Sequence, residues 1–300
     1  MQDQQTATAY RGRFAPSPTG DLHFGSLIAA VGSFLQAKSQ NGTWLIRIED
    51  LDPPREVAGS TERIIADLAA FGMYPDENVV YQSSRIPVYE AALQDLLARN
   101  LAFWCGCSRR HLPDEGIYPG TCRKEIPPDR ERRSIRLKAD RGLIEIDDGI
   151  QGRFGQDLKH EVGDFITRRG DGLVAYQLAT AIDDAWQGIS EVVRGADLLD
   201  STPRQVYLQE LLGLPTPRYA HLPVVLGENG KKLSKRTMAD PVAGTDLAST
   251  LATSLTFLGH PPPNGVSGLD QLWRWAFDHW DISKVPARSG AALFKNTDIA

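Results

Sequence analysis

The sequence has few of the features that mark several large protein classes. It contains 3 cysteines, and its 33 Lys and Arg against 38 Asp and Glu give a formal net charge of −5. Three cysteines cannot build the disulfide framework of a small secreted domain. The acidic balance argues against a protein that coats nucleic acid or an anionic membrane with its whole surface, although it permits a local basic face.

Long hydrophobic runs and a targeting segment are also missing. No run approaches the roughly 18 apolar residues of a membrane-spanning helix, and the first ten residues, MQDQQTATAY, have neither a basic nor an apolar stretch. We therefore expect no secretory signal and a soluble, cytoplasmic protein. The 300 residues are 41% hydrophobic and 24% charged, enough for a sizeable core and about two domains.

Strand and helix patterns alternate over the first hundred residues. Strands are predicted at 11–14, 43–50, 79–81 and 101–104. Helices are predicted at 22–37, 60–71 and 87–99, the last of them capped by Ser84. This alternation is typical of βαβ units, so we predict an α/β fold with a parallel sheet that includes the strand at 101–104.

The pattern changes at Cys105. Strands are predicted at 134–138 and 142–148, followed by a hairpin formed by 164–169 and 173–179 around Gly170-Asp171-Gly172. We therefore expect an insertion with β character. A helix at 201–213, capped by Ser201 or Thr202, a strand at 221–226, and two helices at 247–258 and 269–280 come next. Three prolines at 261–263 suggest that the last helices form a separate tail.

Two short segments suit phosphate chemistry. In the first, residues 16–26 (PSPTGDLHFGS) connect a predicted strand to a helix, and a helix N-terminus is a natural site for phosphates. His23 can donate to a phosphate oxygen and Gly25 lets a flat ring approach the backbone, although a lone histidine at this position is more often structural.

The second segment is a basic loop, Lys232-Leu233-Ser234-Lys235-Arg236, that follows a predicted strand. Clustered cations on a loop can stabilise the charge that develops during transfer at phosphorus. Taken alone, this loop is more often a solvated surface. The sequence G-x-x-x-x-G-K-[ST] is absent, which excludes a P-loop.

Together the two segments resemble the signatures of class I aminoacyl-tRNA synthetases. His23-Phe24-Gly25-Ser26 is similar to the HIGH motif, and the loop 232–236 is similar to the KMSKS motif about two hundred residues later. Ser26 replaces the second histidine of the first motif, and Arg236 replaces the last serine of the second. Further segments are similar to sequences of the glutamyl branch of that family over roughly residues 10–240. They are RFAPSPTG, RIEDLD, YQLA with the following DD, and VVRGADLL.

This resemblance implies a Rossmann-type catalytic domain that binds glutamate and ATP with Mg²⁺ and forms glutamyl-adenylate. It implies catalytic roles for His23, Gly25, Lys232 and Lys235, and contacts to ATP from His23, Gly25, Ser26 and Lys235. The glutamate site that it implies consists of Arg13, Phe14, Ala15, Pro16, Ser17, Glu49, Tyr176 and Arg194. Of these, an arginine suits a carboxylate, to which it can make two parallel hydrogen bonds, and Glu49 suits an ammonium group.

The three cysteines supply soft ligands, but structural zinc usually takes four. Composition alone favours His111 as the fourth ligand. A C-x-C…Y-x₃-C arrangement is similar to the zinc site of small glutamyl-synthetase paralogues, which instead implies one structural Zn²⁺ on Cys105, Cys107, Tyr118 and Cys122. His111 stays the alternative fourth ligand, and three reduced cysteines without metal are the other reading.

Arginines surround the cysteines and suit an RNA backbone, or simply a solvated surface. They are Arg109, Arg110, Arg123, Arg130, Arg132 and Arg133. We expect a division into the first half of the catalytic domain (1–104), the zinc-binding and β insertion (105–165), the second half (166–240) and a helical C-terminal region (241–300).

Sixty-four residues follow Arg236, too few for the anticodon-binding region of a full glutamyl-tRNA synthetase. Catalytic cores of the glutamyl branch that lack this region activate glutamate without tRNA. They then transfer it to queuosine at the wobble position of tRNA(Asp), and the resemblance implies the same reaction here, by a monomer. Single-stranded loops are the usual targets of specific RNA recognition. The alternatives are a truncated glutamyl-tRNA synthetase that charges the tRNA 3′ end, and a non-catalytic tRNA-binding paralogue.

Overall fold

The computed structural model describes residues 9–113, 117–226, 242–288 and 290–292. The helices are α1 (Phe24–Ser39), α2 (Ser60–Ala70), α3 (Ile86–Ala98), α4 (Tyr176–Trp186), α5 (Thr202–Leu212), α6 (Leu247–Phe257) and α7 (Leu269–His279). The strands are β1 (Arg11–Phe14), β2 (Thr43–Ile48), β3 (Val80–Tyr81), β4 (Ala102–Cys105), β5 (Ser134–Leu137), β6 (Leu143–Asp148), β7 (Gly152–Asp157), β8 (Phe165–Arg168), β9 (Glu191–Gly195), β10 (Arg218–Leu222), β11 (Val224–Leu226) and β12 (Gly290–Ala292). Within these ranges, no helix is both long and apolar enough to cross a membrane.

Parallel strands form the centre of the molecule. β1, β2 and β3 pair in parallel, with α1 and α2 as the crossovers between them. β9 and β10 pair in parallel around α5, and β10 also pairs in parallel with β6. The Ser190 N–H donates to the Arg11 carbonyl oxygen over 2.9 Å, so β1 and β9 lie side by side. The predicted α/β fold with a parallel sheet is therefore confirmed.

The parallel strands run outward from β1 to β3 on one side of the sheet and from β9 to β6 on the other, so the order of the strands changes direction between β1 and β9. In open parallel sheets, ligands bind outside the carboxyl ends of the strands at such a reversal. Arg13 lies near the carboxyl end of β1, Glu49 directly follows β2, and Arg194 lies near the end of β9. The topology therefore brings together three side chains that are far apart in the sequence.

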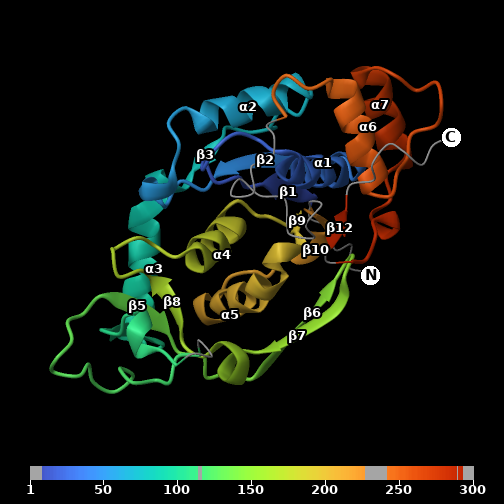
Figure 1. Ribbon diagram of the computed structural model, residues 1–300. Helices are drawn as coiled ribbons and strands as arrows, with labels where there is room; N and C mark the ends of the chain where they lie inside the picture. Colours follow the sequence, from blue (N-terminus) through green and yellow to red (C-terminus); the bar gives the residue numbers. More distant parts are fainter. Residues whose placement is uncertain (1–8, 114–116, 227–241, 289, 293–300) are drawn as a thin grey trace, which may run out of the picture.

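The prediction that the strand at 101–104 belongs to the parallel sheet is wrong. A strand does form at 102–105, but it pairs antiparallel with β5, which pairs antiparallel with β8. This three-stranded sheet and α3 lie at the end of the molecule opposite α6 and α7 (Figure 1). The alternation of strand and helix therefore continues past the point where the chain has left the parallel sheet.

The hairpin predicted around Gly170-Asp171-Gly172 is half correct, because the turn forms but its second strand does not. The Arg169 N–H donates to the Leu173 carbonyl oxygen over 2.8 Å, which closes the turn. Residues 176–186 are helix α4, and the residues just before it make only an isolated bridge to β8. The buried residues of α4 run consecutively from Leu178 to Asp184, without the alternation between two faces that a half-buried strand would show.

Smaller predictions also need correction. Ser84 does not cap α3, because residues 82–85 form a 3₁₀ turn and the Ser84 hydroxyl donates to the Tyr81 carbonyl oxygen. The strand predicted at 221–226 is divided at Pro223 into β10 and β11, since proline has no N–H to donate. The helix predicted at 201–213 forms at 202–212 with Ser201 at the N-cap position, but the Ser201 side chain makes no capping hydrogen bond and accepts from Gln177 instead.

The last two helices are not a separate tail. α6 and α7 pack on α1 and share its hydrophobic core. The Trp273 indole N–H donates to the Phe71 carbonyl oxygen over 2.7 Å, and the Trp273 ring meets Phe34 edge to face. The three prolines therefore follow α6 without separating the next helix from this core.

Candidate functional site

A cavity of about 910 Å³ opens at the carboxyl ends of the parallel strands. Such a volume lies in the range of sites for small molecules and cofactors. Every described residue of the predicted glutamate and ATP sites lines it: Arg13, Phe14, Ala15, Pro16, Ser17, His23, Gly25, Ser26, Glu49, Tyr176 and Arg194. Lys232 and Lys235 lie outside the described residues.

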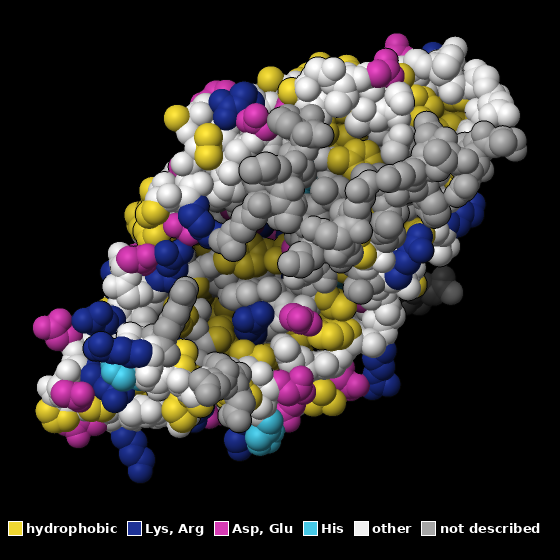
Figure 2. Space-filling model, viewed as in Figure 1, with side chains coloured by type: hydrophobic (Ala, Val, Ile, Leu, Met, Phe, Trp, Pro, Cys, Tyr) yellow, Lys and Arg dark blue, Asp and Glu magenta, His cyan; other side chains and the backbone are white. Residues whose placement is uncertain are grey.

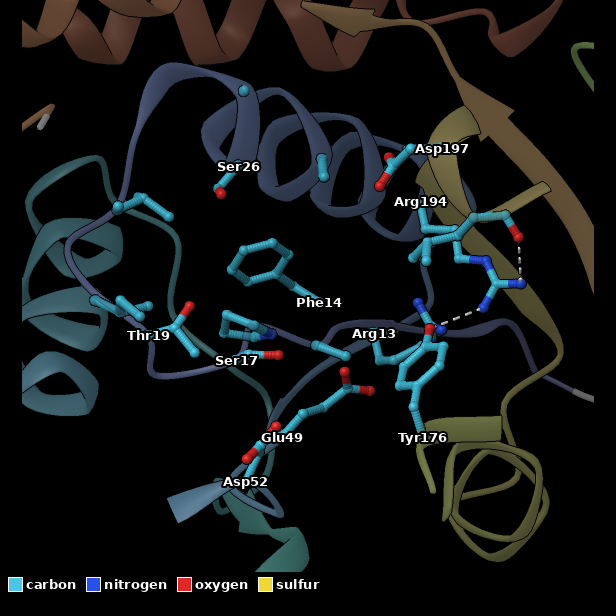
Figure 3. A pocket seen from close by; sticks show the side chains of 18 of the residues that line it. Arg13, Phe14, Ser17, Thr19, Ser26, Glu49, Asp52, Tyr176, Arg194 and Asp197 are labelled. Atoms are coloured by element: carbon cyan, nitrogen blue, oxygen red, sulfur yellow. Dashed lines mark hydrogen bonds between the residues drawn. The ribbon is translucent and has the colours of Figure 1, made fainter. Parts of the chain in front are cut away.

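One end of the cavity carries two guanidinium groups and one carboxylate. Arg13, Glu49 and Arg194 all line this end, and the Arg194 Nη1 donates to the Tyr176 hydroxyl over 3.3 Å (Figure 3). The Glu49 side chain is 9% exposed, and its Oε1 lies 3.7 Å from the Arg47 Nη2. A buried set of two cations and one anion complements a molecule that has two carboxylates and one ammonium group.

Arg13 is fixed from behind by a buried carboxylate. Its Nε donates to Asp184 Oδ1 over 3.0 Å, and the Arg47 Nη1 donates to the same oxygen over 2.8 Å. Burial alone would raise the pKa of Asp184, but the charges of Arg13 and Arg47 hold it below its usual value. Asp184 therefore stays ionised and orients both arginines. The sequence did not reveal this role, because it showed only that two aspartates follow the motif YQLA.

The pKa of the Glu49 carboxyl group is unusually high. Burial raises its pKa to about 7, against the opposing charges of Arg47 and Arg13. The carboxylate that would pair with a substrate ammonium group is therefore lost within the physiological pH range.

This shift predicts a pH-dependent Michaelis constant. As pH falls below about 7, Glu49 takes up a proton, so the KM for an amino-acid substrate should rise by up to about tenfold per pH unit. Steady-state kinetics between about pH 5.5 and 8.5 measure this, a window that brackets the pKa of Glu49. Glu49→Gln is the control, because it should have a high KM at every pH. A wild-type KM that stays constant across this range would contradict the prediction.

The start of α1 forms another wall of the cavity. His23 is the N-cap residue, and its Nδ1 accepts the Ser26 N–H over 3.2 Å. His23 is 8% exposed, and the Ser26 hydroxyl lies 3.0 Å from its Nε2. The structural role expected of a lone histidine is thus present, and the same residue faces the cavity beside the first backbone amides of a sixteen-residue helix. This arrangement suits a phosphate chain.

The cysteines form a second candidate site, away from the cavity. Cys105, Cys107 and Cys122 are buried, and their Sγ atoms all lie within 4.8 Å of one another. The Tyr118 hydroxyl oxygen lies 3.5 Å from Cys105 Sγ and 3.9 Å from Cys107 Sγ. Burial alone would raise the pKa of Cys105, but hydrogen bonds from Tyr118, the Cys107 N–H and Arg136 hold it below its usual value. Thiolate is the form that binds metal, and burial raises the pKa of Cys107 above its usual value, so the two thiols are shifted in opposite directions.

The spacing of Cys107 and Cys122 fits a tetrahedral zinc site. With Zn–S bonds of about 2.3 Å, two tetrahedral sulfur ligands lie about 3.8 Å apart, and the Cys107 and Cys122 Sγ atoms are 3.7 Å apart. His111 is not part of this group, whereas the Tyr118 hydroxyl oxygen lies beside it and also accepts the Cys122 N–H over 2.7 Å. The geometry therefore favours Tyr118 over His111 as the fourth donor.

Comparisons with known proteins identify the family. The family model for the catalytic domain of class I tRNA synthetases (E and Q) matches residues 9–117 and 121–252. A glutamyl-Q tRNA(Asp) synthetase of Chromobacterium violaceum is 50% identical over 285 residues, which cover 93% of this chain and 96% of the relative. The protein of the same name from Dechloromonas aromatica is 49% identical over 93% of this chain and 97% of the relative.

A solved structure matches the same fold. The crystal structure of a glutamate tRNA ligase from Elizabethkingia meningosepticum, in complex with its amino acid, superposes with a TM-score of 0.78 at 27% identity. The match covers 95% of this chain and 67% of the ligase. About a third of the ligase thus has no counterpart in this match.

Proposed function

Because the chain belongs to the glutamyl and glutaminyl family of class I tRNA synthetases, and within it to the glutamyl-Q tRNA(Asp) synthetases, we propose that it is a ligase that transfers glutamate to queuosine in tRNA(Asp). The reaction has two steps. Glutamate first reacts with MgATP, without tRNA, to give glutamyl-adenylate and pyrophosphate. The activated carboxyl group is then transferred to a hydroxyl group of queuosine at the wobble position, and AMP leaves.

The observation that carries this proposal is the charge pattern at one end of the cavity. Arg13 and Arg194 suit the two carboxylates of glutamate, and Glu49 suits its ammonium group. Tyr176 lies against Arg194 and closes the same space. Phe14, Ala15, Pro16 and Ser17 complete the wall along the chain from Arg13.

The activation step then depends on positioning and electrostatics. One glutamate carboxylate attacks the α-phosphorus, a P–O bond forms, and the bond to pyrophosphate breaks. His23, Gly25 and Ser26 lie where the phosphates would meet the N-terminus of α1. His23, together with Lys232 and Lys235 of the basic loop, would stabilise the added negative charge, so no covalent protein nucleophile is needed.

We further propose a structural Zn²⁺ on Cys105, Cys107, Tyr118 and Cys122. Its support is the donor set: three buried thiols whose Sγ atoms lie within 4.8 Å of one another, with the Tyr118 hydroxyl oxygen 3.5 Å from Cys105 Sγ. A zinc ion there would link the chain after β4 to the loop that contains Cys122.

The insertion also offers a basic surface for RNA. Lys and Arg side chains, with acidic ones among them, gather at the end of the molecule that carries α3 and β5 (Figure 2). Arg110, Arg132 and Arg133 are exposed, whereas Arg123 is paired with Asp164 and Asp140. We propose that the exposed arginines contact the phosphates of the anticodon arm, and that the enzyme acts as a monomer.

Charging assays with labelled glutamate test the proposed function. We expect glutamate-dependent ATP–pyrophosphate exchange without RNA, and acceptance of glutamate by tRNA(Asp) that contains queuosine but not by queuosine-free tRNA(Asp). An isolated anticodon arm with queuosine should also accept glutamate, because it contains the proposed acceptor. Since it lacks the 3′ terminus of tRNA, this acceptance cannot be charging of the 3′ end. Charging of queuosine-free tRNA(Glu) would favour a truncated glutamyl-tRNA synthetase. A folded protein without any exchange would favour a non-catalytic paralogue.

A further inference from the structure

Arg194 is held by buried side chains that do not belong to the predicted site. Its Nε donates to Nε2 of His221 over 3.1 Å, and its Nη2 donates to the Thr202 hydroxyl oxygen over 2.8 Å. His221 lies on β10, directly opposite Arg194 on β9 in the register of the two strands. The position of the guanidinium group is thus determined partly from behind the cavity wall.

These contacts define the protonation of the imidazole ring. A guanidinium N–H can only donate, so Nε2 of His221 must present a lone pair to Arg194. Its Nδ1 lies 2.5 Å from Asp148 Oδ2, and both side chains are 0% exposed. Nδ1 therefore carries the proton and donates it to Asp148, which fixes the tautomer.

Asp148 is itself fixed by the backbone. Its Oδ1 accepts the N–H groups of Ile150, Gln151 and His221 over 3.0, 2.8 and 3.0 Å. Burial alone would raise the pKa of Asp148, but the hydrogen bonds from His221 and Gln151 hold it below its usual value. Burial lowers the pKa of His221, with Arg194 acting in the same direction. An ionised carboxylate therefore faces a neutral imidazole.

We propose that Asp148 and His221 are positioning residues, which orient the Arg194 guanidinium group for a carboxylate of glutamate. The hydrogen bonds run from β6 through β10 to β9, across three adjacent strands. The inference rests on the proposed function, because it takes Arg194 as a glutamate-binding residue.

Asp148→Asn tests the tautomer. Three backbone N–H groups hold Oδ1, so the amide oxygen of asparagine should take that place and turn its NH₂ toward Nδ1 of His221. The imidazole must then carry its proton on Nε2, which would oppose the Arg194 N–H. We expect the KM for glutamate in ATP–pyrophosphate exchange to rise about tenfold, with the KM for ATP changed less than about twofold.

Two substitutions of His221 separate its hydrogen bond to Asp148 from its hydrogen bond to Arg194; the Thr202 hydroxyl also lies 3.2 Å from its Nε2. The asparagine amide reaches about as far as Nδ1 of histidine and can keep the bond to Asp148, but it cannot accept from Arg194. The glutamine amide reaches about as far as Nε2 and can accept from Arg194. We expect His221→Asn to raise the KM for glutamate about tenfold and His221→Gln to raise it less than about threefold. A purely structural role would not distinguish the two in this order.

His260→Asn is the matched control. His260 is also buried, its Nε2 accepts the Asp281 N–H, and it stacks on Trp280 away from the cavity. This variant should lower the thermal midpoint without changing either KM. If Asp148→Asn and His221→Asn leave the KM for glutamate within about twofold of wild type, or shift both KM values equally, the positioning role is wrong while wild-type exchange still supports the proposed function. A wild type without exchange overturns both.

Discussion

Replacing Arg194 by alanine is expected to lower kcat/KM for glutamate by about 100- to 5000-fold. Arg194 is 4% exposed at the end of β9 and faces the cavity. Breaking a buried, hydrogen-bonded ion pair costs about 3–5 kcal/mol, and the bound glutamate carboxylate would be left without its partner. Most of the loss should appear in KM, because the contact exists before the activation step as well as during it.

A second arginine provides the control for this experiment. Arg218 begins β10, the neighbouring strand, and its side chain is 71% exposed beside Glu191. Arg218→Ala removes the same group from the same sheet, so its kcat/KM should stay within about twofold of wild type. Steady-state ATP–pyrophosphate exchange measures both variants, and circular dichroism checks that they are folded. An Arg194→Ala enzyme with wild-type kcat/KM would exclude the proposed glutamate contact.

Cys122→Ser is expected to abolish zinc binding and to unfold the region around the cysteines. This region has a small core of five buried residues, namely Phe103, Cys105, Cys107, Tyr118 and Cys122. Structural zinc sites in small peptides contribute about 10–16 kcal/mol of apparent binding energy, far more than so few side chains contribute by packing. Metal analysis should find one zinc per wild-type chain and less than about a tenth of that in the variant.

Hydrogen exchange would show which regions of the protein lose structure in the Cys122→Ser variant. Backbone amides of residues 105–113 and 117–133 should lose protection in Cys122→Ser, while those of β1, β2 and β9 should keep it, because they belong to other hydrophobic cores. Unchanged zinc content in this variant would reject the metal site.

Two further substitutions decide the fourth ligand. Tyr118→Phe removes only the hydroxyl group that lies 3.5 Å from Cys105 Sγ, so it should weaken zinc binding by about 10-fold or more. His111→Ala should leave zinc binding unchanged, since His111 does not belong to the group that the three cysteines form. The reverse result would establish His111 as the ligand in place of Tyr118.

Many residues of the candidate site belong to short sequence motifs. The segment from Arg13 to Ser26 joins a strand to a helix, and the geometry of that junction sets its residues around one cavity. Glu49 directly follows β2. In both places the residues lie where a parallel strand ends, but the sequence suggested them as a site only through the resemblance to a known family, and the predicted strand 43–50 had included Glu49.

The strand patterns were less informative where pairing is not local. The segment 101–104 has the composition of a strand, but composition does not choose between a parallel and an antiparallel neighbour. β7 was missed altogether, because its sequence GRFGQD is mostly polar and lies at the edge of a sheet. The segment 173–179 was assigned as a strand, because the apolar residues that reveal helix α4 continue beyond it to Ile182.

The sequence by itself indicated the class of chemistry, through two motifs that together resemble one family, and it also showed the cysteine cluster, whose members lie within eighteen residues of one another. Only the tertiary structure decided which groups fix the site. The Arg13–Asp184 and Arg47–Asp184 pairs join residues 171 and 137 positions apart. Asp148 and His221 are 73 positions apart, and meet because β6 and β10 are neighbours. A carboxylate in a sequence shows its charge, whereas its partner depends on which strands the fold places side by side.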